Sequence, residues 1–259
     1  MNEFNDLLAA MEEAAREAGQ IAMRYFRRDP KTWLKDVDNP VTAADLEITT
    51  FLRERLLAID PEAGWLSEET ADDPARLTKR SVWVVDPIDG TKEFIDGIPY
   101  FTILICYLVD NMPMVGLVFN PARDQMFTAI RGQGAYLNDD KIHVSGRSTW
   151  KYARVGTSRA HTKKSEMDGH PHLHLLGIGS CGYKMCLVAC GAIDASFNRS
   201  KLHEWDLAAP VLILKEAGGV TSNVDPGQSQ FVFNRTDPYV GGQVSATPEL
   251  FDEVFREFF

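Results

Sequence analysis

Residues 84–97 read VVDPIDGTKEFIDG and place two aspartates directly after a run of apolar β-formers. Buried carboxylates cost solvation free energy unless a partner offsets it, so Asp86 and Asp89 need an explanation. Pro87 fixes one backbone dihedral and Gly90 permits a sharp bend, which predicts a rigid acidic turn where a strand ends. Two carboxylates three positions apart on such a turn can face one point, and Mg²⁺ favours oxygen ligands of this kind. On these residues alone, a structural turn and a metal site are both open.

Two familiar loop motifs do not fit this stretch. An EF-hand loop needs acidic or amide side chains at alternate positions and a glutamate at the twelfth, and a Walker loop needs G-x-x-x-x-G-K. Neither pattern occurs in residues 84–97. Thr91 instead offers a hydroxyl beside backbone N–H groups that are free if a helical turn begins there. An acidic pocket can then hold a phosphate if divalent cations lie between the carboxylates and the anion.

Further carboxylates occur in three other segments. WLSEET (65–70) contains Glu68 and Glu69, HEWDLAAPVLILKEAGG (203–219) contains Asp206, and DNPVTAADLEI (38–48) contains Asp45. Each has an ordinary structural explanation by itself: a solvated turn, a helix N-cap and a carboxylate on a helix surface. Taken together with residues 84–97, they make a shared metal site the more economical interpretation.

The length, the net charge and the cysteine content limit which classes of protein the sequence can belong to. The chain has 259 residues and a formal net charge of -10, enough for one large domain or two joined halves. The acidic charge argues against a nucleic-acid-binding protein. No run of about 18 apolar residues predicts a membrane span, and the acidic N-terminus does not resemble a signal peptide, so we expect a cytoplasmic protein. The four cysteines form no C-x-x-C pair and are expected to be reduced.

The periodicity of apolar residues changes along the chain. Spacing of three to four predicts helices over residues 4–28 and 41–59, the second with Thr42 as N-cap. The next segments, 81–86, 101–130 and 132–138, have the composition of strands joined by short turns. After a break around 146–151, expected strands within 153–158, 175–180 and 193–197 alternate with helices at 181–190, 205–217 and 248–259. This order predicts an α+β half followed by an α/β half.

Three motifs carry a resemblance to a known family. WLSEE, VVDPIDGTKEF and EWDLAAPVLILKEAGG, in this order and spacing, resemble the signatures of the inositol monophosphatase superfamily. The resemblance implies a Mg²⁺-dependent, typically lithium-sensitive phosphomonoesterase that acts on a small phosphorylated metabolite. It also implies a layered αβαβα sandwich and a homodimer, with an α+β half at 1–148 carrying most metal ligands and an α/β half at 149–259 completing the active site.

The resemblance also implies a role for individual positions. Two or three Mg²⁺ ions would be held by four carboxylates and one backbone carbonyl, those of Glu68, Asp86, Asp89, Asp206 and Ile88. Asp45 and Thr91 would orient the attacking water, with Glu68 counted among the catalytic residues as well. The backbone amides of Gly90 and Thr91 would hold the phosphate, and Ser180 and Cys181, in GSCGYKMCLVACGAIDA (179–195), would line the site.

The substrate is less clearly indicated. DGTKEF and HEWD resemble the 3'(2'),5'-bisphosphate nucleotidase branch. Inositol phosphatases carry a glutamate seven residues before the last aspartate of that motif, where this chain has Arg199, and an arginine can pair with a second phosphate. Against this, the predicted hairpin GQGAYLNDDKIHVS (132–145) is frequent among inositol phosphatases. We therefore expect a bisphosphate nucleotidase, with an inositol-1-monophosphatase, a sugar or histidinol phosphatase and a non-catalytic metal-binding scaffold as alternatives.

Overall fold

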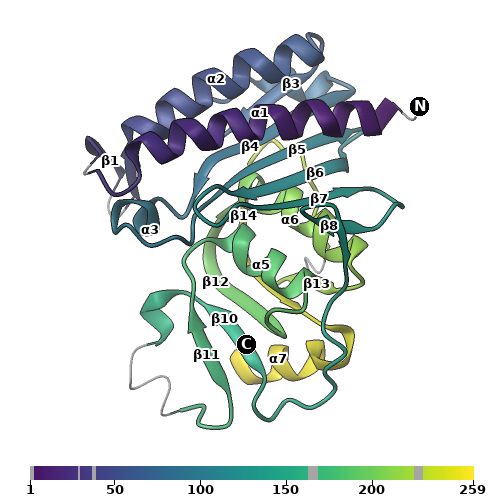
Figure 1. Cartoon of the computed structure of the whole chain (residues 1–259). Helices are drawn as coiled ribbons and strands as arrows, with labels where there is room; N and C mark the ends of the chain where they lie inside the picture. Colours follow the sequence, from purple (N-terminus) through teal and green to yellow (C-terminus); the bar gives the residue numbers. More distant parts are fainter. Residues whose placement is uncertain (1–2, 29, 37–38, 163–168, 225–229) are drawn as a thin grey trace.

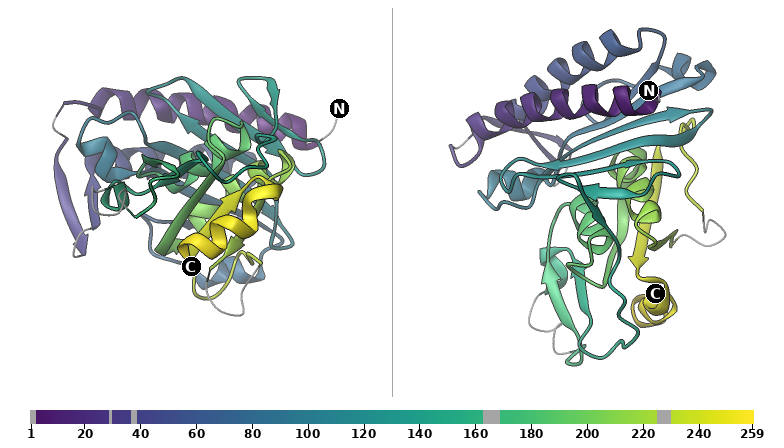
Figure 2. Two further views of the ribbon diagram at one scale, coloured as in Figure 1. Left: turned by 90° about the horizontal axis from the view of Figure 1, so that it is seen from below. Right: turned by 45° about the vertical axis from the view of Figure 1, so that its right-hand side comes forward.

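The structure, a computed structural model, describes residues 3–28, 30–36, 39–162, 169–224 and 230–259. Figure 1 shows its layers in sequence colours: two helices, a sheet, two helices, a second sheet and a last helix. The predicted αβαβα sandwich is therefore confirmed. Figure 2 shows the same stacking from two other directions, with the last helix lying on the far side of the second sheet.

The outer helical layer consists of α1 (Glu3–Tyr25) and α2 (Ala43–Ile59). Helix α1 buries a stripe of mostly small side chains: Met11, Ala14, Ala15, Ala18, Gly19 and Ala22. This spacing places them on one face, and that face packs against α2 and the first sheet. Thr42 is the N-cap of α2, as predicted, and its hydroxyl accepts a hydrogen bond from the Ala44 N–H at 3.2 Å.

The first sheet has seven strands among the described residues, in the order β3-β4-β5-β6-β7-β8-β9. They are β3 (Gly64–Ser67), β4 (Ser81–Asp89), β5 (Thr102–Val109), β6 (Met112–Asn120), β7 (Gln125–Ile130), β8 (Ala135–Leu137) and β9 (Asp140–Ile142). Only the β3–β4 pair is parallel among these; the rest are antiparallel neighbours, and the strands from β5 to β9 are joined by short turns. A separate hairpin, β1 (Thr32–Asp36) and β2 (Asn39–Thr42), precedes α2.

The middle layer consists of α5 (Cys181–Ala189) and α6 (Glu204–Glu216). Nine of the thirteen residues of α6 are buried, including the whole run from Leu207 to Leu214, as expected for a largely apolar helix between two sheets. Gly116 of β6 allows the close approach, because a Cβ there would lie 3.0 Å from the Ala209 carbonyl oxygen.

The second sheet has five strands in the described part of the chain, ordered β11-β10-β12-β14-β13. They are β10 (Arg154–Thr157), β11 (His174–Gly177), β12 (Ala195–His203), β13 (Val220–Asn223) and β14 (Tyr239–Ala246). The final helix, α7 (Phe251–Phe258), packs on this sheet through Val254 and Phe258. Short 3₁₀ turns complete the description: η1 (Pro74–Thr78), η2 (Arg159–Thr162) and η3 (Pro248–Leu250).

One hydrophobic core joins the two sheets. Leu104 of β5 and Val118 of β6 belong to the same buried cluster as Met185 of α5 and Leu212 of α6. The division into residues 1–148 and 149–259 stays a prediction, since its boundary falls between β9 and β10 but the core extends across it.

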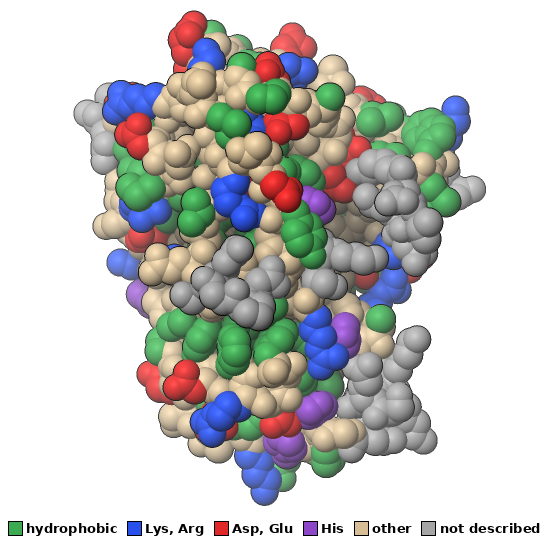
Figure 3. All heavy atoms as spheres, turned by 180° about the vertical axis from the view of Figure 1, so that it is seen from behind, with side chains coloured by type: hydrophobic (Ala, Val, Ile, Leu, Met, Phe, Trp, Pro, Cys, Tyr) green, Lys and Arg blue, Asp and Glu red, His purple; other side chains and the backbone are tan. Residues whose placement is uncertain are grey.

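None of the described helices is long and apolar enough to span a bilayer. On the face shown in Figure 3, Lys and Arg side chains are scattered among acidic and apolar ones.

Candidate metal centre and phosphate site

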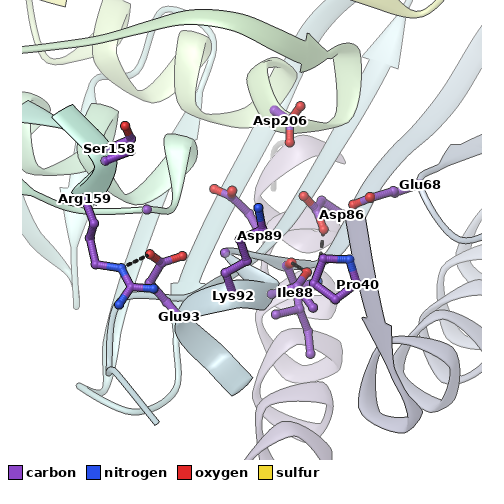
Figure 4. Close-up of a pocket in the computed structure, with 14 residues that line it drawn as sticks. Pro40, Glu68, Asp86, Ile88, Asp89, Lys92, Glu93, Ser158, Arg159 and Asp206 are labelled. Atoms are coloured by element: carbon purple, nitrogen blue, oxygen red, sulfur yellow. Dashed lines mark hydrogen bonds and ion pairs between the residues drawn. The ribbon is translucent and has the colours of Figure 1, made fainter. Parts of the chain in front are cut away.

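A cavity of about 670 Å³ opens where the two sheets and the middle helices meet. Figure 4 shows the side chains that line it, with carboxylates gathered on one side and an Arg–Glu pair on the other. The lining residues come from β2, the residue after β3, the end of β4, the start of α3 (Thr91–Ile95), the β10–η2 junction, the β11–α5 loop and the start of α6: Pro40, Glu68, Asp86, Ile88, Asp89, Gly90, Thr91, Lys92, Glu93, Ser158, Arg159, Ala160, Gly179 and Asp206.

A β-bulge places Asp86 and Asp89 in this cavity. The sequence predicts that the strand ends at Asp86, but β4 continues to Asp89. Asp86 pairs with Leu104 of β5, and Asp89 pairs with Thr102. The two partners are three residues apart on β4 but only two residues apart on β5, so β4 contains one extra residue. Residues three apart on a regular strand point to opposite faces, and the extra residue of a bulge reverses this parity. Both carboxylates therefore line the cavity.

Asp206 joins them from another element. It is the third residue of α6, where its Oδ2 accepts a hydrogen bond from the His203 N–H at 2.7 Å. One carboxylate oxygen each from Asp86, Asp89 and Asp206 can be chosen so that all lie within 4.8 Å of one another. Glu68 follows β3 directly and lines the same cavity. The structure thus brings together the four carboxylates that the sequence selected.

Burial and mutual repulsion make these carboxylates hard to ionise without a cation. Desolvation, followed by the charges of Glu68 and Asp89, raises the pKa of Asp86 well above its usual value. Desolvation and the charge of Asp89 raise the pKa of Asp206 in the same way. Burial raises the pKa of Asp89 to about 6, although hydrogen bonds from Ser180 and Gly182 oppose the shift.

The residues of the cluster fit a hard divalent cation. Among the described residues, no lysine or arginine forms an ion pair with Asp86, Asp89 or Asp206. Like charges at this separation in a buried site are strongly unfavourable, and a divalent ion would remove that cost. All the available ligand atoms are oxygens, which Mg²⁺ prefers.

The turn after β4 supplies the groups for an anion. Gly90 has φ = 99°, a left-handed conformation that suits glycine, and a Cβ there would lie 3.0 Å from the Tyr100 carbonyl oxygen. Helix α3 begins at Thr91, whose hydroxyl donates to the Ile88 carbonyl oxygen at 3.2 Å. Gly90, Thr91 and Ile88 all line the cavity, as the predicted phosphate and metal roles require.

Asp45 occupies a different position from the one its sequence suggests. On its own it looks like a carboxylate on a helix surface, but it is buried in the first turn of α2. Its Oδ2 accepts hydrogen bonds from the Thr42 N–H at 2.8 Å and the Thr42 hydroxyl at 2.6 Å. Burial raises the pKa of Asp45 to about 7. Because Thr91 donates to Ile88, the proposed Asp45–Thr91 pair stays a prediction.

Ser180 and Cys181 contact the site through Asp89. The Ser180 hydroxyl donates to Asp89 Oδ2 at 2.6 Å and caps α5 by accepting from the Tyr183 N–H. The Cys181 and Gly182 N–H groups also donate to the Asp89 carboxylate, at 3.2 and 2.6 Å. The N-terminus of α5 therefore holds one metal-ligand candidate in place, while Gly179 is the residue of this segment that lines the cavity.

Arg199 lies outside the cavity lining. It is an exposed residue of β12 whose guanidinium lies 5.8 Å from the centre of the Phe197 ring. Among the described residues, the cationic side chains that line the cavity are those of Lys92 and Arg159. The sequence analysis missed Arg159, because its partner Glu93 is 66 residues away and no local pattern links them.

Lys184 is a second residue that the sequence analysis missed. It is fully buried in α5, where Nζ donates to the Ile178 carbonyl oxygen at 3.0 Å and to Asn198 Oδ1 at 2.9 Å. Burial lowers its pKa. A lysine inside the apolar segment CGYKMCLVAC was a signal that could have been noticed, since buried lysines are rare unless partnered.

Comparisons with known proteins agree with this geometry. The sequence model of the inositol monophosphatase family matches residues 4–256. Inositol monophosphatase 2 of Solanum lycopersicum is 34% identical over 244 residues, which cover 89% of this chain and 90% of the relative. The 3'(2'),5'-bisphosphate nucleotidase CysQ of Aggregatibacter actinomycetemcomitans is 30% identical over 243 residues, which cover 90% of each chain.

Solved structures have the same fold. The extragenic suppressor protein suhB from Bartonella henselae superposes with a TM-score of 0.85 at 25% identity, covering 97% of this chain and 98% of that one. The Thermotoga maritima IMPase gives a TM-score of 0.86 at 23% identity, with 97% and 96% covered. The second likeness concerns the fold alone.

Proposed function

The chain belongs to the inositol monophosphatase family and is a metal-dependent phosphatase; we propose that it is a Mg²⁺-dependent phosphomonoesterase whose preferred substrate is a nucleoside 3'(2'),5'-bisphosphate. The supporting observation is that one cavity holds both a carboxylate cluster and cationic side chains. Four carboxylates that fit divalent cations line it together with Lys92, which lies beside Asp89, and Arg159, which pairs with Glu93 on the other side. A substrate with a phosphate to be cleaved and a second anionic group fits such a cavity.

The residues of this chain supply positions and charges rather than a covalent nucleophile. Glu68, Asp86, Asp89, Asp206 and the Ile88 carbonyl oxygen would hold two or three Mg²⁺ ions. When bound, such ions neutralise phosphate charge and lower the pKa of water. The backbone N–H groups at the start of α3 would bind the phosphate oxygens, and the Thr91 hydroxyl would help to orient the attacking water.

The rigidity of this arrangement comes from its surroundings. Asp89 is fixed by three donors of α5, and Asp206 by the backbone of its own helix. Because these ligands are already fixed, little reorganisation energy is required as charge develops in the transition state. Asp45 remains our candidate for a water-orienting carboxylate, with its raised pKa as a reason to expect a role.

Inositol 1-phosphate is the second candidate substrate. It is favoured by the relatives, since Solanum lycopersicum proteins named inositol monophosphatase 2 and inositol monophosphatase 3 are each 34% identical to this chain. The nucleotidase relative is 30% identical, so overall similarity does not decide the substrate. The content of the cavity favours the bisphosphate, because its cationic side chains are better partners for a phosphate than for sugar hydroxyls.

Phosphate release in the presence of Mg²⁺ tests the proposal. Adenosine 3',5'-bisphosphate and inositol 1-phosphate are compared, each with and without lithium, which we expect to inhibit. A higher kcat/KM for the nucleotide supports the nucleotidase assignment, and a higher value for inositol 1-phosphate overturns it in favour of the second candidate. Release from neither substrate, together with retained Mg²⁺ binding, would identify a non-catalytic scaffold. Light scattering of the same sample tests the expected homodimer.

A further inference from the structure

Arg159 lies at the edge of the cavity in a well-defined orientation. It begins η2, directly after β10, and its Nε donates to Glu93 Oε1 at 2.9 Å. Its Nη2 donates to Asp96 Oδ2 at 2.5 Å. Glu93 and Asp96 belong to α3 and its C-cap, so the contact joins the second sheet to the helix that starts at Thr91. Figure 4 shows the guanidinium beside Glu93, with Lys92 between this pair and Asp89.

Glu93, the first carboxylate partner of Arg159, is buried. The Glu93 side chain is only 7% exposed and lies directly against the backbone of Gly179. A Cβ added to Gly179 would lie 1.9 Å from the Glu93 carboxylate carbon, closer than any packing allows. Glycine at this position therefore makes room for Glu93, which lines the cavity beside Arg159.

Arg159 keeps donors that these contacts do not use. A guanidinium has five N–H donors in a fixed fork, and two of them serve Glu93 and Asp96. No described residue accepts a hydrogen bond from Nη1. The side chain is 40% exposed, and Arg159 lines the cavity. An arginine that lines a pocket and keeps unused donors can bind a phosphate bidentately.

We propose that Arg159, oriented by Glu93 and Asp96, determines substrate specificity by binding the anionic group that the substrate carries in addition to the phosphate being cleaved. The proposal rests on the proposed phosphatase function and specifies its substrate class: small metabolites with two phosphates or a phosphate and a second strong anion. It gives to Arg159 the role that sequence spacing suggested for Arg199. Arg199 is exposed on β12 beside Phe197 and does not line the cavity.

The test is a ratio of specificities. For each variant, kcat/KM for adenosine 3',5'-bisphosphate is divided by kcat/KM for adenosine 3'-phosphate, which lacks the second phosphate. Arg159→Gln should lower this ratio about ten- to a hundredfold, the range expected for hydrogen bonds to a charged group. Arg159→Lys should lower it less, since lysine keeps the charge but not the fork. Glu93→Gln should also lower it less, because the guanidinium remains.

Arg154→Gln is the matched control. Arg154 has the same exposure as Arg159, 39% against 40%, and also pairs with a buried carboxylate, that of Asp194. It does not line the cavity, so both kcat/KM values should match those of the wild type. A general loss of structure in Arg159→Gln would appear as a lower unfolding temperature than that of Arg154→Gln. In that case the ratio of kcat/KM values is compared between the wild type and Arg159→Lys instead.

Failure of the inference can be distinguished from failure of the proposed function. A wild type that releases phosphate from neither nucleotide overturns both. A wild type that prefers the bisphosphate, with a ratio unchanged within twofold in Arg159→Gln and Arg159→Lys, overturns the role of Arg159 alone. A fall in the ratio for Arg199→Gln without a fall for Arg159→Gln would assign the second anion to Arg199 instead.

Discussion

Asp86 and Asp89 point into the same cavity although they are three residues apart on one β-strand. The bulge opposite Leu104 and Thr102 brings this about. Pro87, within the bulge, has no N–H for the ladder, and prolines in strands are found at such places. The acidic turn expected from the sequence is thus part of strand β4, and the metal site depends on one extra residue in its pairing.

Asp89→Asn should abolish turnover while leaving the protein folded. The change removes one ligand charge from the cluster but keeps the volume of the side chain. Loss of several kcal/mol of charge stabilisation corresponds to a rate decrease of roughly a hundredfold or more. Phosphate release and circular dichroism of the variant measure the two effects. Asp124→Asn is the control, because Asp124 is an exposed turn residue whose side chain is 83% exposed. Near-normal activity of Asp89→Asn would show that the site is wrongly assigned.

The metal-free protein should lose stability as the pH rises from about 4 to about 7. The pKa of Asp45 is raised to about 7 and that of Asp89 to about 6, so the folded state binds more protons than the unfolded state in this range. Stability then falls with rising pH, by roughly 1.4 kcal/mol per unit of pKa shift for each group. The lowered pKa of Asp194 acts only at lower pH.

Urea unfolding in EDTA at several pH values measures this dependence. Saturating Mg²⁺ should flatten it, because the ion binds the ionised carboxylates of the folded state. Stability in EDTA that stays level or increases towards about pH 7 would mean that the carboxylates are not forced together in the metal-free protein.

Gly179→Ala should destabilise the protein and disturb Arg159. The new Cβ would overlap the Glu93 carboxylate, and relieving such overlap costs typically about 1–3 kcal/mol. Gly146→Ala is the matched control, since a Cβ there meets nothing within 4 Å. Urea midpoints of the two variants make the comparison, with kcat/KM on the bisphosphate as a second readout. Equal midpoints would show that Glu93 can move freely.

Arg76→Ala should be strongly destabilising. Arg76 is 1% exposed and pairs with Asp72 at 2.5 Å, and it also donates to Asn234 Oδ1 at 2.7 Å and the Arg235 carbonyl oxygen at 2.9 Å. Removing one partner from a buried network costs roughly 3–5 kcal/mol.

The control for this variant lies four residues away. Arg80 has an 82% exposed side chain and lies 3.9 Å from Asp110, so Arg80→Ala should cost less than about 1 kcal/mol. Chemical denaturation compares the two variants. A loss for Arg76→Ala no larger than that for Arg80→Ala would mean that the buried network contributes little to stability.

Much of the order of helices and strands was predictable from local periodicity, but the sequence analysis predicted none of β1, β2, β3, β13 and β14. The apolar stripe of α1 and the Thr42 cap of α2 both reflect interactions within a few residues. The carboxylates of the site were found because acidic residues beside buried strands and helices are costly, and because their motifs resemble a family.

The contacts between distant segments were not predictable in this way. Arg159 meets Glu93 across 66 residues, and the Ser180 hydroxyl meets Asp89 across 91. Neither pair has a local signal, since each joins segments that are far apart in the sequence and meet only in the folded arrangement of sheets and helices. The choice of Arg199 as the partner of a second phosphate followed from spacing along the chain, whereas the cavity lining depends on the path of β12.

The most direct test of the account is phosphate release from adenosine 3',5'-bisphosphate during a titration with Mg²⁺, for the wild type and for Asp206→Asn. The carboxylate cluster predicts no release in EDTA, a saturable increase with Mg²⁺ in the wild type, and a large loss in the variant even at high Mg²⁺. Release by the wild type in EDTA, or equal activity of Asp206→Asn, would contradict a metal centre at Asp86, Asp89 and Asp206.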